Sequence, residues 1–240
     1  MKKIIYIILS ITMLTACKKE SSNPTTTPTN SNSTAISKYG NGVTDIEGNR
    51  YKTVIIGSQE WMGENLKVST YNDGTILPNL TQNSEWKNNT TGAWSFYNND
   101  ATNNSKYGKL YNWYTVSYSM NGNKNVCPTS WHVPSDSEWS ILIEYLGGES
   151  TAGGKMKEVG ESNWQTPNIN ATNKSLFSAL PGGNRNDDGT YYGIRKYGNW
   201  WSSTSELSQN NYWNFHLHFD DENIGKGHEV GGLSIRCIKD

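Results

Sequence analysis

The segment from Asn184 to Trp201 combines polar side chains with two consecutive tryptophans. A sugar ring can stack on an exposed aromatic face, while amide, carboxylate and guanidinium groups hydrogen-bond its hydroxyls. Loops held by a rigid scaffold are also where binding residues concentrate. We therefore expect a ligand surface, with a glycan or another surface component as the ligand, formed by Asn184, Arg185, Asp187, Asp188, Trp200 and Trp201. The alternative, that one or both tryptophans lie in the core, stays open.

Two patterns could hold a metal ion, and neither is complete. The run from Asn184 to Gly189 imitates the start of a calcium loop, but position twelve of such a loop would be Arg195 in place of a bidentate glutamate. His216 and His218 would share one face of a strand, where Asp220 could join them as a third ligand. A polar turn and ordinary alternation explain both patterns. We therefore expect no bound metal and no other cofactor.

Three carboxylates could be imagined as the acid and base of a glycosidase: Asp136, Glu138 and Glu144. A helix cap and a helix surface explain the same residues, so we expect a binding or adhesion domain without catalysis. Two alternatives stay open, an enzyme acting on envelope polysaccharide and a structural subunit of a surface assembly.

The composition describes a β-rich chain with no excess of charge. The 240 residues carry 21 basic and 22 acidic side chains, a formal net charge of -1, so nucleic acid is not an expected partner. Only 18% of residues are charged, and 12% are aromatic. This balance, with many Asn, Ser, Thr and Gly residues, favours short strands joined by polar turns.

The first residues have the pattern of an export signal. Lys2 and Lys3 precede an apolar run from Ile4 to Leu14, which is too short to span a bilayer as a helix. The sequence Leu14-Thr15-Ala16-Cys17 that follows resembles the lipobox of bacterial lipoproteins. That resemblance implies a signal peptide at 1–16 and attachment of lipid, such as palmitate, to Cys17.

The lipid would hold the protein in the cell envelope, at the outer membrane, on a face that the sequence does not decide. Residues 17–38 are rich in Ser, Thr, Asn and Pro, so we expect a disordered linker after the anchor. A single domain is expected to fill residues 39–240.

Two cysteines remain once Cys17 is assigned to lipid. In an oxidising compartment, Cys127 and Cys237 are expected to form one disulfide. Two buried thiols are the alternative, because sequence alone does not establish the geometry of a bridge.

Periodicity and turn residues predict several elements of the domain. Val43 to Ile56 is typical of a hairpin, Trp61 to Val68 of a continuing strand, and the region from Tyr71 to Lys106 of long loops anchored by aromatic residues. A capping box at Ser135 predicts a helix over 136–146. Alternation predicts strands from Asn214 to Asp220 and from Leu233 to Ile238.

Several motifs together resemble one family. They are Tyr107-Gly108-Lys109-Leu110-Tyr111-Asn112-Trp113-Tyr114, Cys127-Pro128, Trp131-His132-Val133-Pro134 before Glu138-Trp139, Ala179-Leu180-Pro181-Gly182-Gly183, Trp200-Trp201-Ser202-Ser203-Thr204 and Ser234-Ile235-Arg236-Cys237. In this order they resemble the Fibrobacter succinogenes major paralogous domain, which is common in lipoproteins. The resemblance supplies no activity, and fold analogy cannot provide one.

A more distant likeness bears on the fold. The spacing of Val133-Pro134, Glu138-Trp139 and Arg236-Cys237 is also similar to that of formylglycine-generating and C-type-lectin-like domains. This implies an irregular, β-rich α+β fold in a single domain. The copper chemistry of formylglycine-generating oxidases is not expected, because Cys127 and Cys237 occupy positions typical of structural residues.

Overall fold

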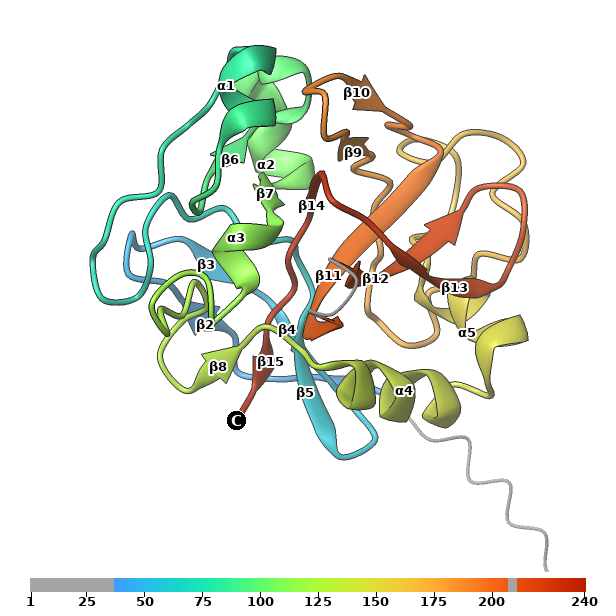
Figure 1. The fold of residues 1–240 in the computed structure, drawn as a ribbon. Helices are drawn as coiled ribbons and strands as arrows, with labels where there is room; N and C mark the ends of the chain where they lie inside the picture. Colours follow the sequence, from blue (N-terminus) through green and yellow to red (C-terminus); the bar gives the residue numbers. More distant parts are fainter. Residues whose placement is uncertain (1–36, 207–210) are drawn as a thin grey trace, which may run out of the picture. The chain divides into compact units, whose positions relative to one another are not determined.

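The computed structural model describes residues 37–206 and 211–240, which form a β-rich unit with a few short helices (Figure 1). The predicted signal peptide, Cys17 and nearly all of the linker lie outside the described residues. Within the described part of the chain, no helix combines the length and apolar character needed to cross a bilayer.

The first sheet has the strand order β1-β4-β5-β15-β8. Its strands are β1 (Lys38–Tyr39), β4 (Thr53–Ile56), β5 (Gln59–Met62), β15 (Ile238–Lys239) and β8 (Trp131–His132). Ile238 of β15 pairs with Trp61 of β5 on one side and with His132 of β8 on the other. The last strand of the sequence thus lies inside this sheet.

A second sheet has the order β10-β9-β14-β7-β6, and a two-stranded sheet joins β2 to β3. The strands are β10 (Tyr191–Tyr192), β9 (Asn184–Arg185), β14 (Gly232–Leu233), β7 (Leu110–Asn112), β6 (Trp94–Ser95), β2 (Val43–Thr44) and β3 (Arg50–Tyr51). The hairpin predicted at Val43 is confirmed for β2 and β3, whereas β4 turns away to pair with β1 and β5.

The third sheet, β11-β12-β13, holds the longest strands of the described residues. Its members are β11 (Tyr197–Glu206), β12 (Asn211–His218) and β13 (Ile224–His228). The alternation predicted from Asn214 is confirmed as far as His218, because Phe215 and Leu217 are buried while His216 and His218 are partly exposed. The chain turns after His218, earlier than predicted.

Helices are short and lie between the strands. They are α1 (Asn83–Asn88), α2 (Asn104–Tyr107), α3 (Trp113–Val116), α4 (Asp136–Tyr145) and α5 (Glu149–Met156), with 3-10 turns η1 (Tyr97–Asn99) and η2 (Ala101–Asn103). The predicted helix α4 is confirmed together with its capping box, in which the Ser135 amide donates to Glu138 Oε2 at 2.7 Å. The region from Tyr71 to Lys106, predicted as long loops, also holds α1, β6, η1, η2 and most of α2, and the expected aromatic anchors are buried Trp86 and Trp94.

Two clusters of apolar side chains form the interior. The first gathers Leu66, Tyr111, Trp113, Trp201 and Ile235, with the disulfide Cys127–Cys237 among them. The second packs α4 and α5 against the β11-β12-β13 sheet and contains Trp61, Trp139, Trp164, Trp200 and Phe215. The predicted disulfide therefore lies inside a core, where both of its residues are 0% exposed.

The prediction of one strand from Leu233 to Ile238 is wrong. Every residue from Gly232 to Ile238 is buried, so this segment has no solvent-facing side. Its ends belong to different sheets, β14 and β15, and between them Arg236 extends its guanidinium through the interior. Arg236 donates to Asn65 Oδ1 at 2.9 Å and to the Ser178 carbonyl at 2.9 Å.

Candidate functional site

The two tryptophans expected to face a ligand are core residues. Trp200 and Trp201 are both 0% exposed. The Trp200 indole donates to Asn65 Oδ1 at 2.9 Å, and the Trp201 indole donates to the Tyr111 carbonyl at 2.7 Å. Burial with a satisfied N–H is the usual state of a core indole. The prediction that these two rings line a ligand surface is corrected accordingly.

Arg185 is also a buried residue, at 0% exposure. Its guanidinium lies 4.4 Å from the centre of the Trp86 ring and donates to the Gly189 carbonyl at 2.9 Å and to the Leu80 carbonyl. Burial lowers the pKa of this guanidinium. Arg185 therefore fixes the loop around it and presents no donor to a ligand, contrary to the prediction.

Asp187 and Asp188 lie exposed in a tight turn. Asp188 Oδ1 accepts from the Thr190 hydroxyl at 2.6 Å and from the Thr190 amide at 2.8 Å, and these two bonds hold the turn closed and lower the pKa of Asp188. Asn186 and Thr190 close the same turn through a backbone bond of 2.7 Å. The prediction of a polar turn from Asn184 to Gly189 is confirmed. Arg195, which stands where a calcium loop would have its glutamate, donates to the Ser162 carbonyl.

The remaining candidate, Asn184, lines a groove of about 350 Å³ on the outer side of the third sheet. We call this the Tyr–His groove. Its lining residues are Asn184, Asn186, Tyr192, Tyr197, Asn199, Asn214, His216, His218, Gly227, His228 and Glu229. Side chains from β9, β10, β11, β12 and β13 thus meet at one surface.

Strand alternation and glycine explain why the surface is hollow here. Asn214 and His216 face outward from β12, and their partners on β13 are Gly227 and Gly225. A Cβ atom at position 225 would overlap His216 Nε2, and one at position 227 would lie 3.4 Å from His216 Cε1. The two glycines of Ile224-Gly225-Lys226-Gly227-His228 therefore leave room for the His216 ring on this face of β13.

Four aromatic rings follow one another along the groove. Tyr192 and Tyr197 stack with centroids 5.6 Å apart, and Tyr197 meets the His218 ring edge-on at 4.7 Å. His218 then stacks with His216 at 5.2 Å. Tyr192 is 54% exposed, so the row begins at a residue that is accessible to solvent.

Amide groups and uncharged imidazole accompany these rings. The Asn184 amide donates to Asn186 Oδ1 at 2.8 Å, and His216 Nδ1 lies 3.2 Å from Asn214 Oδ1. Burial, followed by the neighbouring His218, lowers the pKa of His216, so its imidazole is neutral at pH 7. The groove thus offers polar groups with little charge.

The turn after β12 gathers possible metal ligands. One ligand atom each from His218, Asp220 and Asp221 lies within 4.8 Å of the others. The set expected from the sequence joined His218 with His216 and Asp220, and it lacked Asp221. His216 lies outside the observed cluster, although its ring stacks on that of His218.

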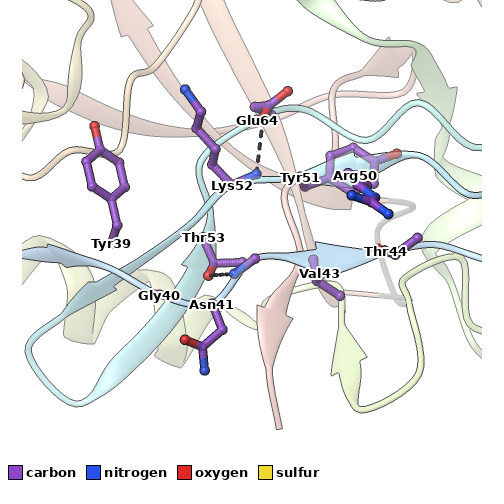
Figure 2. Close-up of a pocket in the computed structure, with 11 residues that line it drawn as sticks. Tyr39, Gly40, Asn41, Val43, Thr44, Arg50, Tyr51, Lys52, Thr53 and Glu64 are labelled. Carbon is purple, nitrogen blue, oxygen red and sulfur yellow. Dashed lines mark hydrogen bonds between the residues drawn. The ribbon is translucent and has the colours of Figure 1, made fainter.

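A larger hollow of about 770 Å³ lies beside β1, β2 and β3. Figure 2 shows Tyr39 at one end and Arg50 at the other, with Glu64 accepting from the Lys52 amide at 3.1 Å. Tyr39 is 61% exposed, but Tyr51 is buried and donates to Asp45 Oδ2 at 2.7 Å. This hollow therefore presents one open aromatic ring rather than a row.

The carboxylates weighed as catalytic groups have structural partners. Glu138 accepts from His132 at 2.8 Å in addition to capping α4, and these bonds lower its pKa to about 2 despite partial burial. Asp136 pairs with Lys226 at 2.6 Å, and Glu144 is exposed on α4. Glu138 and Glu60 line one hollow of about 570 Å³, where Lys239 pairs with Glu60 at 2.8 Å.

Sequence reasoning missed most residues of the Tyr–His groove. Tyr192, Tyr197 and Asn199 lie inside the segment predicted to bind a ligand, but the paired tryptophans are its stronger sequence signal. Alternation on β12 predicted that His216 and His218 face away from the core. It could not predict which other strands lie beside these two residues. The glycines at 225 and 227 were the available signal, because alternate glycines on one face of a strand mark a place where another group approaches closely.

A comparison with protein-family models matches residues 54–239 to the Fibrobacter succinogenes major domain. A search of curated proteins and a search of solved structures each returned no match to this chain.

Proposed function

This chain belongs to the Fibrobacter succinogenes major domain family, and on that premise we propose that it is a cell-envelope lipoprotein whose Tyr–His groove binds a glycan. The proposal includes a lipid anchor at Cys17 and attachment to the outer membrane. It also includes a C-type-lectin-like arrangement of the domain, supported by its irregular β-rich architecture and few short helices.

The observation that carries the proposal is the row of rings from Tyr192 to His216. Pyranose rings have apolar faces that stack on aromatic side chains, and several aromatic rings along one groove offer more than one contact to an extended ligand. Tyr192 and Tyr197 provide the first two rings, and His218 continues the row. The hollow beside Tyr39 has one open ring and therefore lacks such a row.

The polar groups of the groove suit the hydroxyls of an uncharged sugar. Asn186 and Asn199 contribute partly exposed amides that can both donate and accept hydrogen bonds, whereas Asn184 and Asn214 are only 8% and 5% exposed. Glu229 is the acidic residue of the lining, and His216 is neutral at pH 7. We therefore propose a neutral glycan rather than a phosphorylated one.

An envelope hydrolase is the second candidate, and the hollow lined by Glu60 and Glu138 is where it would act. A glycosidase needs one carboxylic acid that stays protonated, which requires a raised pKa. The pKa values of Glu60 and Glu138 are both lowered, by hydrogen bonds from Lys239 and Thr53 and from His132 and Ser135 respectively, although burial opposes the change. This favours binding over hydrolysis.

The test is a glycan array probed with the full chain carrying Cys17→Ser, followed by titration of each hit against two variants. Tyr192→Ala removes the most exposed ring of the row and is expected to weaken binding at least 10-fold. Tyr39→Ala is the matched control, because it removes a tyrosine of similar exposure, 61% against 54%, from the other hollow. Loss of binding in Tyr39→Ala alone would move the site there, and release of reducing ends from a hit would favour the hydrolase.

A further inference from the structure

We infer that the turn after β12 binds a divalent transition-metal ion of the zinc class through His218, Asp220 and Asp221. Their ligand atoms lie within 4.8 Å of one another. The inference reverses the expectation from sequence that no metal is bound, and Asp221 is the residue that changes it. Metal binding by itself does not depend on the proposed glycan function.

The distances are close to those of a bound ion. Zinc bonds to imidazole nitrogen and carboxylate oxygen are about 2.0 to 2.2 Å, so two ligands of one tetrahedral ion lie about 3.3 to 3.6 Å apart. His218 Nδ1 and Asp221 Oδ2 are 3.9 Å apart. Small rotations of these side chains and of Asp220, which is exposed, would close the remaining difference.

Lys157 fixes the backbone of this turn. Its ammonium is 0% exposed and donates to the His218 carbonyl at 3.0 Å, the Asp221 carbonyl at 2.6 Å and the Ile169 carbonyl at 2.9 Å. All three protons of the ammonium are directed at backbone oxygens. The carboxylates of Asp220 and Asp221 therefore keep oxygens for a cation, on a turn that needs no ordering when the ion binds.

A second hydrogen bond orients Asp221. Its Oδ1 accepts from the Asn223 amide at 2.9 Å, while its Oδ2 is the atom nearest His218. Metal-binding carboxylates are commonly held in this way, with one oxygen bonded to the protein and the other to the ion. The turn thus has the support that a ligand carboxylate requires.

The ligand types select the ion. Calcium and magnesium take oxygen ligands almost exclusively, whereas an imidazole with carboxylates suits zinc and its neighbours. Three protein ligands leave a fourth tetrahedral position for water or for a ligand oxygen. His218 also lines the Tyr–His groove, so the metal site and the groove share one residue, and contact of the ion with a glycan hydroxyl is the one step that rests on the proposed function.

The experiment is calorimetric titration of zinc chloride into the full chain at pH 7.5, without an affinity tag and with Cys17→Ser in every variant to remove that thiol. We expect one ion per chain, with affinity at least 10-fold lower in His218→Ala and in Asp221→Asn. Asp187→Asn is the matched control, because it removes an exposed aspartate from another turn. Its affinity is expected to equal that of the parent.

Cobalt provides a second readout of the same site. The parent is expected to give visible absorption bands on addition of cobalt chloride, and both site variants are expected to lose them while keeping the parent's circular dichroism spectrum. Absence of zinc binding in the parent, or equal binding in His218→Ala, would overturn the metal site. Neither measurement includes a glycan, so failure here and failure on the glycan array are separate results.

Discussion

Trp200 and Trp201 are adjacent in β11, yet their indoles lie in different cores. Trp200 packs with Trp139 and Phe177, whereas Trp201 packs with Trp113 beside the disulfide. Successive residues of a strand point to opposite faces of a sheet, so β11 lies between the two apolar clusters and places one tryptophan in each. The pair therefore joins the halves of the interior.

Truncation of Trp200 tests its structural role. Trp200→Ala is expected to lower the free energy of unfolding by about 3 to 5 kcal/mol, the usual cost of deleting a core tryptophan. Urea unfolding followed by circular dichroism measures the change. Tyr192→Ala, which removes a ring that is 54% exposed, should cost under about 1 kcal/mol. A stable Trp200→Ala protein would contradict the burial of this residue.

Reduction of Cys127–Cys237 is expected to destabilise the domain strongly. The bridge links residues separated by 110 positions, and in the chain-entropy model a loop of that size contributes about 4.7 kcal/mol. We expect the double variant Cys127→Ala/Cys237→Ala to melt well below the parent in a thermal scan. Peptide mapping without reductant should recover the two cysteines in one linked pair, and free thiols at both positions would refute the bridge.

His132 makes stability depend on pH. It lies 2.8 Å from Glu138 and 2.7 Å from Asp240, and these hydrogen bonds, with Glu138 first, raise its pKa from 6.5 to about 9 against the opposing effect of burial. A raised histidine pKa gives stabilisation that is complete below pH 6.5 and is lost as the pH rises through 9.

The partner carboxylate has the opposite dependence. The pKa of Glu138 is lowered from 4.5 to about 2, so its contribution is complete above pH 4.5 and is lost as the pH falls through 2. The pair is therefore strongest between pH 4.5 and 6.5. We expect the stability advantage of the parent over His132→Asn, measured by urea unfolding, to shrink between pH 6 and pH 9.5. An advantage that does not change would contradict the ion pair.

Lipid attachment at Cys17 predicts where the protein fractionates. Cys17→Ser is expected to move the protein from the membrane fraction to the soluble fraction and to abolish incorporation of a labelled fatty acid. Cys127→Ala should keep the label, because its thiol is assigned to the disulfide. Labelling that persists in Cys17→Ser would end the lipoprotein interpretation.

Local signals in the sequence were sufficient for elements that depend on neighbouring residues. The capping box at Ser135 predicted α4, and alternation at Phe215 and Leu217 predicted the buried face of β12. These signals act over a few residues, so the rest of the fold does not alter them. The family could likewise be identified from sequence motifs alone, because these motifs are short runs of adjacent residues in a fixed order.

Predictions failed where burial depends on distant segments. The residues around Arg185 and Trp200 are as polar and aromatic as a binding loop, and only contacts with distant residues make them core residues. Arg185 contacts Leu80, 105 positions away, and Trp200 contacts Asn65, 135 positions away. The Tyr–His groove also depends on distant segments, because Asn184 and His216 line it from strands of two different sheets. A single sequence carries no direct record of such contacts.

The central place of β15 also constrains when the domain can fold. During synthesis from the N-terminus, β5 and β8 are made long before Ile238, their common partner, exists. Until then each presents an unpaired edge of the kind that promotes association between chains. Completion of this sheet is consequently a late event, and a ribosome that stalls before residue 238 would release a product prone to aggregation rather than a smaller folded domain.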